Sequence, residues 1–193
     1  MSKLYKSRVR PFSSMYPFAM QNEFYKFIDQ SEEKLLVAIF TFCDKQAARK
    51  LVLAQARGVD VRIVMQQPVN TSPVLRMLKS FKIPTAVFKS NSAGAIMHNK
   101  YMVSDGKRVW LGSMNFTDPA YKINFESAVT LHSYALAQYF SKDFKVIEQR
   151  IRQQQKAEQV RINQFRANMR KERDRCMRMV LAYRLLQKEK LKK

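Results

Sequence analysis

Two side chains near the middle of the sequence, His98 and Lys100, are well suited to chemistry on a phosphate group. They are followed by Asp105 and, after six further residues, by a Gly-Ser-x-Asn run at residues 112–115. In a strand over residues 97–103, side chains two apart share a face, so the imidazole and the ammonium would lie side by side. The ammonium can neutralise the non-bridging oxygens of a phosphate while the imidazole attacks phosphorus or protonates an oxygen.

The run at residues 112–115 supplies two further polar side chains. The same alternation places Ser113 and Asn115 on one face, where a hydroxyl and an amide can donate hydrogen bonds to phosphoryl oxygens. A His-x-Lys pair alone is a frequent coincidence, whereas the full spacing of His, Lys, Asp and Gly-Ser-x-Asn is specific. The sequence therefore indicates phosphoryl-transfer chemistry centred on His98.

The sequence offers no pattern for a metal or a cofactor. Its two cysteines are Cys43 and Cys176 and its two histidines are His98 and His132, so no zinc-ligand spacing exists. An acidic cluster that could clamp a divalent ion is also missing. We therefore expect no metal ligand and no cofactor, and we expect both cysteines to be reduced packing residues.

Alternating strand-like and helix-like segments surround these residues. Asp44 is the expected N-cap of the first helix and Gly58 its C-cap, and Pro73 suits the first turn of the next helix. This order of segments indicates an α/β domain, in which a mixed sheet carries helices on its faces. The expected strands cover residues 35–42, 59–65, 85–88, 97–103, 108–111 and 125–131, and the expected helices cover residues 45–57, 72–81 and those from 134 onward.

A long basic helix follows this domain. The sequence has neither glycine nor proline after residue 119, so nothing interrupts a helix from about residue 134 onward. Residues 150–193 hold 15 Lys or Arg and 4 Asp or Glu, a net charge of +11 out of +21 for the chain. We therefore divide the chain into a catalytic domain at 1–149, which opens with a basic arm at 1–22, and a basic helical extension at 150–193.

Apolar side chains recur at roughly heptad spacing along the extension. Phe165 and Tyr183 either face a second helix, which this spacing favours, or stack on unpaired bases. The full set comprises Ile162, Phe165, Met169, Cys176, Val180 and Tyr183.

The strongly basic composition indicates a polyanionic partner. Lys and Arg number 36 against 15 Asp and Glu, an excess that favours nucleic acid or an anionic membrane surface. No apolar run approaches the ~18–20 residues of a membrane span. The N-terminal segment is basic as far as Glu23, which resembles an organelle transit peptide, but it has no apolar core of a secretion signal. We expect a cytoplasmic location, with an organelle as the alternative.

The string of His-x-Lys, Asp and Gly-Ser-x-Asn resembles the histidine–lysine–aspartate signature of the phospholipase D superfamily. Residues 35–66 are similar to the family's opening unit, and residues 124–129 are similar to the segment after its signature. The resemblance covers about residues 20–149. It is greatest to the single-signature branch of bacterial Nuc-type endonucleases and Zucchini-type mitochondrial enzymes, and it implies a phospholipase D-like mixed sheet flanked by helices.

The resemblance also implies a mechanism that needs no metal. In this family one histidine attacks phosphorus to form a phosphohistidine, a second histidine protonates the leaving oxygen, and water resolves the intermediate. This chain carries one signature, and His132 has no x-Lys partner. The second histidine would therefore be His98 of a second copy, which implies a homodimer with its active site on the two-fold axis.

The remaining signature residues receive roles by resemblance. Lys100, Ser113 and Asn115 would bind the phosphate, and Glu126 would orient the catalytic histidine. Asp105 completes the catalytic signature, although its place at a strand end, beside a glycine, favours a structural role.

The signature specifies a phosphodiester bond and leaves the substrate open. The charge favours an endonuclease that acts on DNA or RNA. One alternative is a cardiolipin-type lipid phosphodiesterase bound to an anionic membrane through its basic helix, and another is a nucleic-acid-binding protein that keeps the fold without activity. The basic side chains expected to bind nucleic acid are Lys100, Arg150, Arg152, Arg161, Arg166, Arg170 and Lys171.

Overall fold

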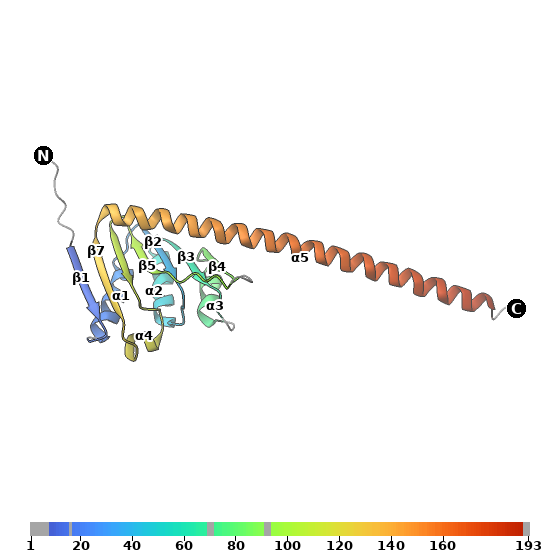
Figure 1. The fold of residues 1–193 in the computed structure, drawn as a ribbon, viewed down its shortest axis with the longest axis horizontal. Coiled ribbons are helices and arrows are strands. Elements are labelled where there is room, and N and C mark those ends of the chain that lie inside the picture. The colour runs from blue at the N-terminus through green and yellow to red at the C-terminus, as the bar shows by residue number, and fades with distance from the viewer. Residues whose placement is uncertain (1–7, 16, 69–71, 91–93, 191–193) are drawn as a thin grey trace. The chain divides into compact units, whose positions relative to one another are not determined.

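The computed structural model describes residues 8–15, 17–68, 72–90 and 94–190, and the chain divides into two compact units, residues 1–151 and 152–193. The first unit is built on a seven-stranded mixed sheet with the strand order β1-β7-β6-β5-β2-β3-β4 (Figure 1). The strands are β1 Arg8–Ser13, β2 Lys34–Ile39, β3 Asp60–Gln66, β4 Thr85–Phe88, β5 Lys100–Ser104, β6 Arg108–Gly112 and β7 Ser127–His132. The helices are α1 Pro17–Asp29, α2 Lys45–Ala56, α3 Pro73–Ser80, α4 Asp118–Lys122 and α5 Tyr134–Lys190.

Parallel and antiparallel pairing meet at β2 within this sheet. β2 pairs in parallel with β3, and β3 with β4, because α2 and α3 supply the crossover connections that parallel strands need. On its other side β2 is antiparallel to β5, and the strands β5, β6, β7 and β1 continue antiparallel. The expected mixed α/β sheet with a long C-terminal helix is therefore confirmed, and its antiparallel half brings the signature strands side by side.

Both faces of the sheet are covered, as the side chains along β2 demonstrate. Leu35, Val37 and Ile39 share a core cluster with residues of α1, α2, α3 and α4. Leu36 and Ala38 point to the opposite face and share a second cluster with the start of α5. Since a strand covered on both faces must be apolar at every position, this burial explains the continuous apolar run in the sequence.

Local signals set the ends of the helices in the parallel half. Asp44 caps α2 and accepts hydrogen bonds from the backbone amides of Gln46 at 2.7 Å and Ala47 at 3.0 Å. Gly58 follows the end of α2 with a φ of 95°, a left-handed conformation that glycine adopts without strain. Ser72 caps α3. The helices and strands expected between residues 44 and 88 are confirmed.

The structure differs from expectation at the N-terminus. Residues 1–22 are expected as a basic arm, yet residues from Arg8 onward belong to the folded unit as β1 and α1. β1 lies at the edge of the sheet and pairs with β7. Pro11 has no backbone N–H to donate, and an edge strand, which is unpaired on one side, tolerates this. Residues 1–7 and 16 lie outside the described residues.

Two further expectations need correction. The strand expected over residues 97–103 begins only at Lys100, because its neighbour β2 ends at Ile39 and leaves residues 97–99 without a ladder partner. The two cysteines, expected as packing residues, are both exposed.

The long helix α5 continues through residue 190, as the absence of glycine and proline predicts. Between residues 152 and 184 its apolar side chains are exposed, among them Phe165 at 65% and Tyr183 at 63%. Their pairing with a second helix or with bases stays a prediction. Among the described residues, no helix combines the length and the apolarity needed to cross a membrane.

Candidate active site

All the signature residues except Asp105 lie at one end of the antiparallel half of the sheet. Lys100 is the first residue of β5, Gly112 the last of β6, and Ser127 the first of β7. The register pairs Tyr101 with Leu111, and Gly112 with Ala128, so these three strand ends are adjacent. The catalytic residues expected from the sequence, except Asp105, thus come together through the pairing of three strands.

Gly112 permits the close approach of β6 to β7. A Cβ atom at this position would lie 2.4 Å from the carbonyl oxygen of Ser127 and 2.8 Å from the Cα and Cβ atoms of Ala128. Backbone atoms cannot yield to such an overlap, so a side chain here would push the two strands apart. The glycine therefore keeps Ser113 within reach of the start of β7, where its backbone amide donates to the carbonyl of Ser127 at 2.9 Å.

The ammonium of Lys100 lies against the imidazole of His98. Its Nζ is 3.3 Å from Nδ1 and 3.2 Å from Nε2, and it donates a hydrogen bond to the His98 carbonyl oxygen at 3.0 Å. Lys100 is only 8% exposed, whereas His98 is exposed. A phosphate can therefore reach the imidazole from solvent and find a positive charge directly behind it.

Phe40 forms the wall on the other side of this pair. Its ring centroid is 4.5 Å from that of His98, and the Lys100 Nζ lies 5.2 Å from the Phe40 centroid, within the range of a cation–π contact. The sequence alone did not single out Phe40 as a site residue, although it directly follows the apolar run of β2. Phe40 is a positioning residue that restricts where the imidazole can lie.

Burial and a nearby carboxylate shift the pKa of Lys100 in opposite directions. Burial lowers the pKa of Lys100 because it penalises the charged form, and the negative charge of Glu126 opposes this shift. Glu126 is itself buried at 8% exposure. The carboxylate therefore favours the protonated lysine that a phosphate needs.

Glu126 is held by two neighbouring side chains. The hydroxyl of Ser113 donates a hydrogen bond to its Oε2, and the amide of Asn124 donates to its Oε1 at 3.2 Å. Of the hydrogen bonds between described residues, none joins Glu126 to His98, so the orienting role expected for Glu126 remains a prediction. Asn124 was not expected at the site from sequence, because its function depends on the carboxylate two residues later.

Asn115 links the signature to the end of β2. Its Oδ1 accepts a hydrogen bond from the backbone amide of Thr41 at 3.3 Å, and the backbone amide of Phe116 donates to the Thr41 carbonyl at 3.0 Å. With Oδ1 engaged in this way, the Nδ2 group is the donor that can serve a phosphoryl oxygen. The same contact fixes Phe40, the neighbour of Thr41, beside His98.

Asp105 lies at the opposite end of β5 and does not reach the reacting groups. Its Oδ1 accepts hydrogen bonds from the backbone amides of Glu32, Glu33 and Lys34 at 2.9–3.1 Å, and its Oδ2 accepts from the Ser104 hydroxyl at 2.9 Å. Burial by itself raises the pKa of Asp105, but these hydrogen bonds outweigh it and lower the pKa overall. The arrangement fits the structural role favoured by its place in the sequence.

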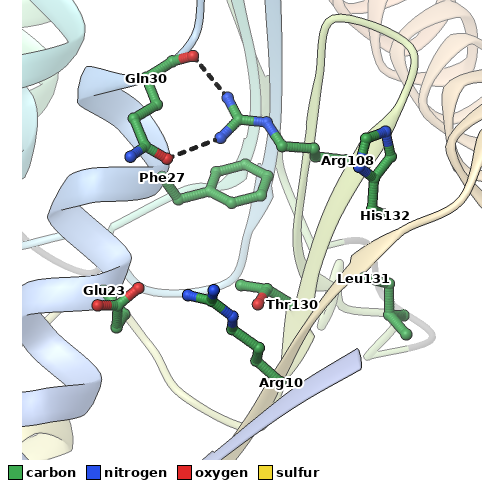
Figure 2. A pocket seen from close by; sticks show the side chains of 8 residues that line it. All are labelled: Arg10, Glu23, Phe27, Gln30, Arg108, Thr130, Leu131 and His132. Atoms are coloured by element: carbon green, nitrogen blue, oxygen red, sulfur yellow. Dashed lines mark hydrogen bonds between the residues drawn. The ribbon is translucent and has the colours of Figure 1, made fainter. Parts of the chain in front are cut away.

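A cavity of about 270 Å³ opens at that same far end, between α1 and the strands β1, β6 and β7 (Figure 2). Arg108 borders it, and its guanidinium donates to Gln30 Oε1 at 3.0 Å and to the Gln30 carbonyl at 2.6 Å. His132, the last residue of β7, lines this cavity as well. The second histidine of the sequence thus lies at the opposite end of the strands from His98.

The sequence predicts no metal ligand, and it predicts that basic side chains of the extension bind nucleic acid. Within the part of the chain that the structure describes, no group of three or more His, Cys, Asp or Glu residues could hold a metal ion.

The basic side chains expected to bind nucleic acid along α5 are all exposed: Arg150, Arg152, Arg161, Arg166, Arg170 and Lys171. Of these, all but Arg150 belong to the second unit.

Comparison with known proteins identifies the family. The family described as "Cardiolipin synthase, PLD-like domain" matches residues 24–147. The chain belongs to this phospholipase D-like family. It is 33% identical over 115 residues to a phospholipase D of Rickettsia conorii, covering 58% of this chain and 56% of the relative. It is 26% identical over 137 residues to the mitochondrial cardiolipin hydrolase of Danio rerio, covering 69% and 60% of the two chains.

Two solved structures share the phospholipase D-like fold. Nuc from Salmonella typhimurium, a phospholipase D family member, superposes with a TM-score of 0.64 at 26% identity, over 72% of this chain and 93% of that one. NucT from Helicobacter pylori gives a TM-score of 0.65 at 20% identity, over 74% and 96%. The predicted family and fold are therefore confirmed, and the matched region ends before the second unit of this chain.

We expect Asp105→Asn to lower the free energy of unfolding at neutral pH by about 1–3 kcal/mol, because it weakens several hydrogen bonds to a buried carboxylate. Since folding lowers the pKa of Asp105, the charged carboxylate stabilises the fold above the usual aspartate pKa. This stabilisation is lost as the pH falls through the lowered pKa. Urea unfolding at a series of pH values should therefore show the difference between variant and wild type shrinking on acidification.

The matched control is Asp118→Asn, whose side chain is 77% exposed at the start of α4. Its effect should stay within roughly 0.5 kcal/mol, as for most surface substitutions. A difference between Asp105→Asn and wild type that does not change with pH would contradict the structural account of Asp105.

Proposed function

We propose that this protein is a metal-independent phosphodiesterase that cleaves nucleic acid in an active site shared by two copies of the chain. The observation that carries this proposal is the exposed imidazole of His98 with the buried ammonium of Lys100 against it. A nucleophile open to solvent and backed by a fixed positive charge suits attack on an anionic phosphodiester.

The proposed reaction has two displacements at phosphorus. A neutral His98 attacks and forms a phosphorus–nitrogen bond, while the bond from phosphorus to the leaving oxygen breaks and that oxygen takes a proton from a second, protonated imidazole. Water then attacks the phosphohistidine, gives its proton to the second imidazole and releases His98. Lys100 and Asn115 bind the non-bridging oxygens in both steps. Ser113 donates its hydroxyl hydrogen to Glu126, and Glu126 is the positioning residue that supports Lys100.

A second copy supplies the second imidazole in this proposal. The sequence holds His98 and His132, and His132 lines the cavity at the far end of β7. Apolar side chains beside the site offer a surface for the second copy, because Ile123 is 76% exposed and Phe125 is 99% exposed just before β7. Large exposed apolar side chains of this kind are typical of an interface.

Charge supports nucleic acid as the substrate. The chain carries a net charge of +21, of which residues 150–193 contribute +11. Each phosphate contact made by a lysine or arginine releases a counterion, so an exposed basic helix can contribute strongly to affinity for a nucleic acid. We propose that the exposed Arg and Lys side chains of α5 bind the substrate backbone away from the reacting phosphate.

A lipid phosphodiesterase is the second candidate function. The relatives from Rickettsia conorii and Danio rerio are called phospholipase D and mitochondrial cardiolipin hydrolase. An anionic bilayer would also attract the basic helix. The chain spans only 56% and 60% of those relatives, so their names support this candidate less than the charge supports nucleic acid.

The test of the proposed function is cleavage of labelled single- and double-stranded DNA and RNA in excess EDTA. We expect wild-type cleavage to persist, because the proposed nucleophile and acid are imidazoles. His98→Ala should lower the rate by roughly a thousandfold or more, as removal of a nucleophile does in other enzymes.

The matched control is His132→Ala, which removes the other histidine and should leave the rate within about twofold, since it touches no reacting group. Loss of activity in EDTA would contradict the metal-independent mechanism. Hydrolysis of anionic phospholipid vesicles with no cleavage of any nucleic acid would favour the lipid candidate instead.

The role of the extension is tested by replacing Arg161, Arg166, Arg170 and Lys171 with Gln. We expect weaker binding of single-stranded DNA and a shallower dependence of the binding constant on salt. The slope of log K against log salt should fall by roughly one for each replaced side chain that neutralises a phosphate in the wild type. Fluorescence anisotropy at several salt concentrations measures both quantities.

A variant with the same loss of charge elsewhere provides the control. Lys45, Arg49, Arg76 and Lys79 are exposed on α2 and α3, and their replacement with Gln should change the slope less. Equal slopes for the two variants would mean that only net charge matters, and would contradict a specific role for the extension.

A further inference from the structure

A pocket of about 560 Å³ lies beside the reacting groups and is not used by the mechanism above. It is formed where β2 and β3 end and α3 begins. Phe40, Phe42, Met65 and Ile96 give it apolar walls. Among the described residues that line it, none carries a charge at neutral pH, a marked contrast with the +21 of the chain.

The pocket shares its walls with the active site. The ring of Phe40, one of its walls, lies 4.5 Å from the ring of His98. Thr41, another lining residue, donates its backbone amide to Asn115 of the signature at 3.3 Å. Gln66 lines the pocket and accepts a hydrogen bond from the backbone amide of Met97 at 2.9 Å. A group in the pocket would therefore lie close to a phosphate bound at His98.

We propose that this pocket holds the unpaired base of the nucleotide next to the scissile phosphate, and this inference rests on the proposed nuclease function. A nucleotide combines an anionic phosphate with a flat, uncharged, aromatic base. The site offers the matching pair, the Lys100 ammonium for the phosphate and an uncharged aromatic pocket for the base. Stacking on a ring such as Phe40 suits any base, so the pocket favours bases without a sequence preference.

Polar groups in the pocket favour a base over the acyl chain of a lipid. The residues Thr41, Gln67 and Ser90, which carry hydroxyl and amide groups, are part of the lining, and the Ser90 hydroxyl accepts a hydrogen bond from the Gln66 amide at 3.1 Å. A hydrocarbon chain would cover these groups without giving them hydrogen bonds, whereas the edges of a base can pair with them. The pocket also disfavours a paired base, because a base within a duplex must first give up its stacking and its hydrogen bonds. The substrate is therefore single-stranded at the site of cleavage.

Cys43 offers a way to fill the pocket in the intact protein. It lines the pocket and is exposed, and the only other cysteine, Cys176, lies in the second unit. In a Cys176→Ser background, benzyl methanethiosulfonate adds a bulky group to Cys43 as a disulfide. Methyl methanethiosulfonate adds a small group at the same atom and is the matched control, and dithiothreitol removes both groups.

The experiment compares a short single-stranded DNA with a strand of equal length whose residues are all abasic. Both carry the same phosphates, so they differ only in the bases. We expect the base-bearing strand to be cleaved with a kcat/KM at least about tenfold higher, the effect of one stacked base. The benzyl group should abolish this preference, the methyl group should retain most of it, and dithiothreitol should restore it.

Methyl p-nitrophenyl phosphate is a small diester without a base, so its hydrolysis measures cleavage of the phosphodiester without any contribution from the pocket. The unmodified, benzyl-modified and methyl-modified proteins should hydrolyse it at equal rates. Equal cleavage of the two strands, or a preference that survives the benzyl group, would overturn the base pocket and leave the nuclease proposal standing. Hydrolysis of the small diester with no cleavage of either strand would overturn the nuclease proposal and the base pocket together.

Discussion

A lysine ammonium buried beside an exposed imidazole is the constraint on which the rest of this structure depends. Burial disfavours the charge of Lys100, so the fold must supply compensation close by. The compensation is the carboxylate of Glu126, which is itself buried and is held by Ser113 and Asn124. Lys100 begins β5, Ser113 directly follows β6, and Asn124 and Glu126 lie just before β7, so the register of three strands fixes the electrostatics of the site. Gly112 matters for this reason, because it lets β6 and β7 approach closely enough to bring Ser113 to Glu126.

The two ends of these strands have different tasks. At one end the imidazole of His98 is exposed, with the ammonium of Lys100 and the amide of Asn115 close by, and these groups can act on a ligand. At the other end Asp105 and Arg108 direct their hydrogen bonds to the protein: the carboxylate ties down three backbone amides and the guanidinium holds the end of α1. The signature therefore combines reacting groups with a turn that anchors the strand on which they lie.

Much of this site follows from sequence, because it depends on local spacing. The contact between His98 and Lys100 and the helix cap at Asp44 each involve neighbours along the chain, and both are present as expected. The strand alternation expected at His98, Ser113 and Asn115 is absent, because β5 begins at Lys100 and β6 ends at Gly112. Phe40 was missed because its contact with His98 arises only after strands distant in the sequence have paired. Asn124 was missed because its contact depends on the fixed position of the Glu126 carboxylate. The edge strand β1 was missed for a related reason: its basic, proline-containing sequence becomes a strand only through pairing with β7.

We propose that one active site needs His98 from two copies of the chain. The most direct measurement is the activity of a heterodimer of wild type and His98→Ala, isolated through two different affinity tags. In this heterodimer a shared site retains one His98 imidazole, so it lacks either the nucleophile or the acid. We therefore expect almost no cleavage. Half of the wild-type dimer's activity would mean that each chain holds a complete site, and would contradict the claim.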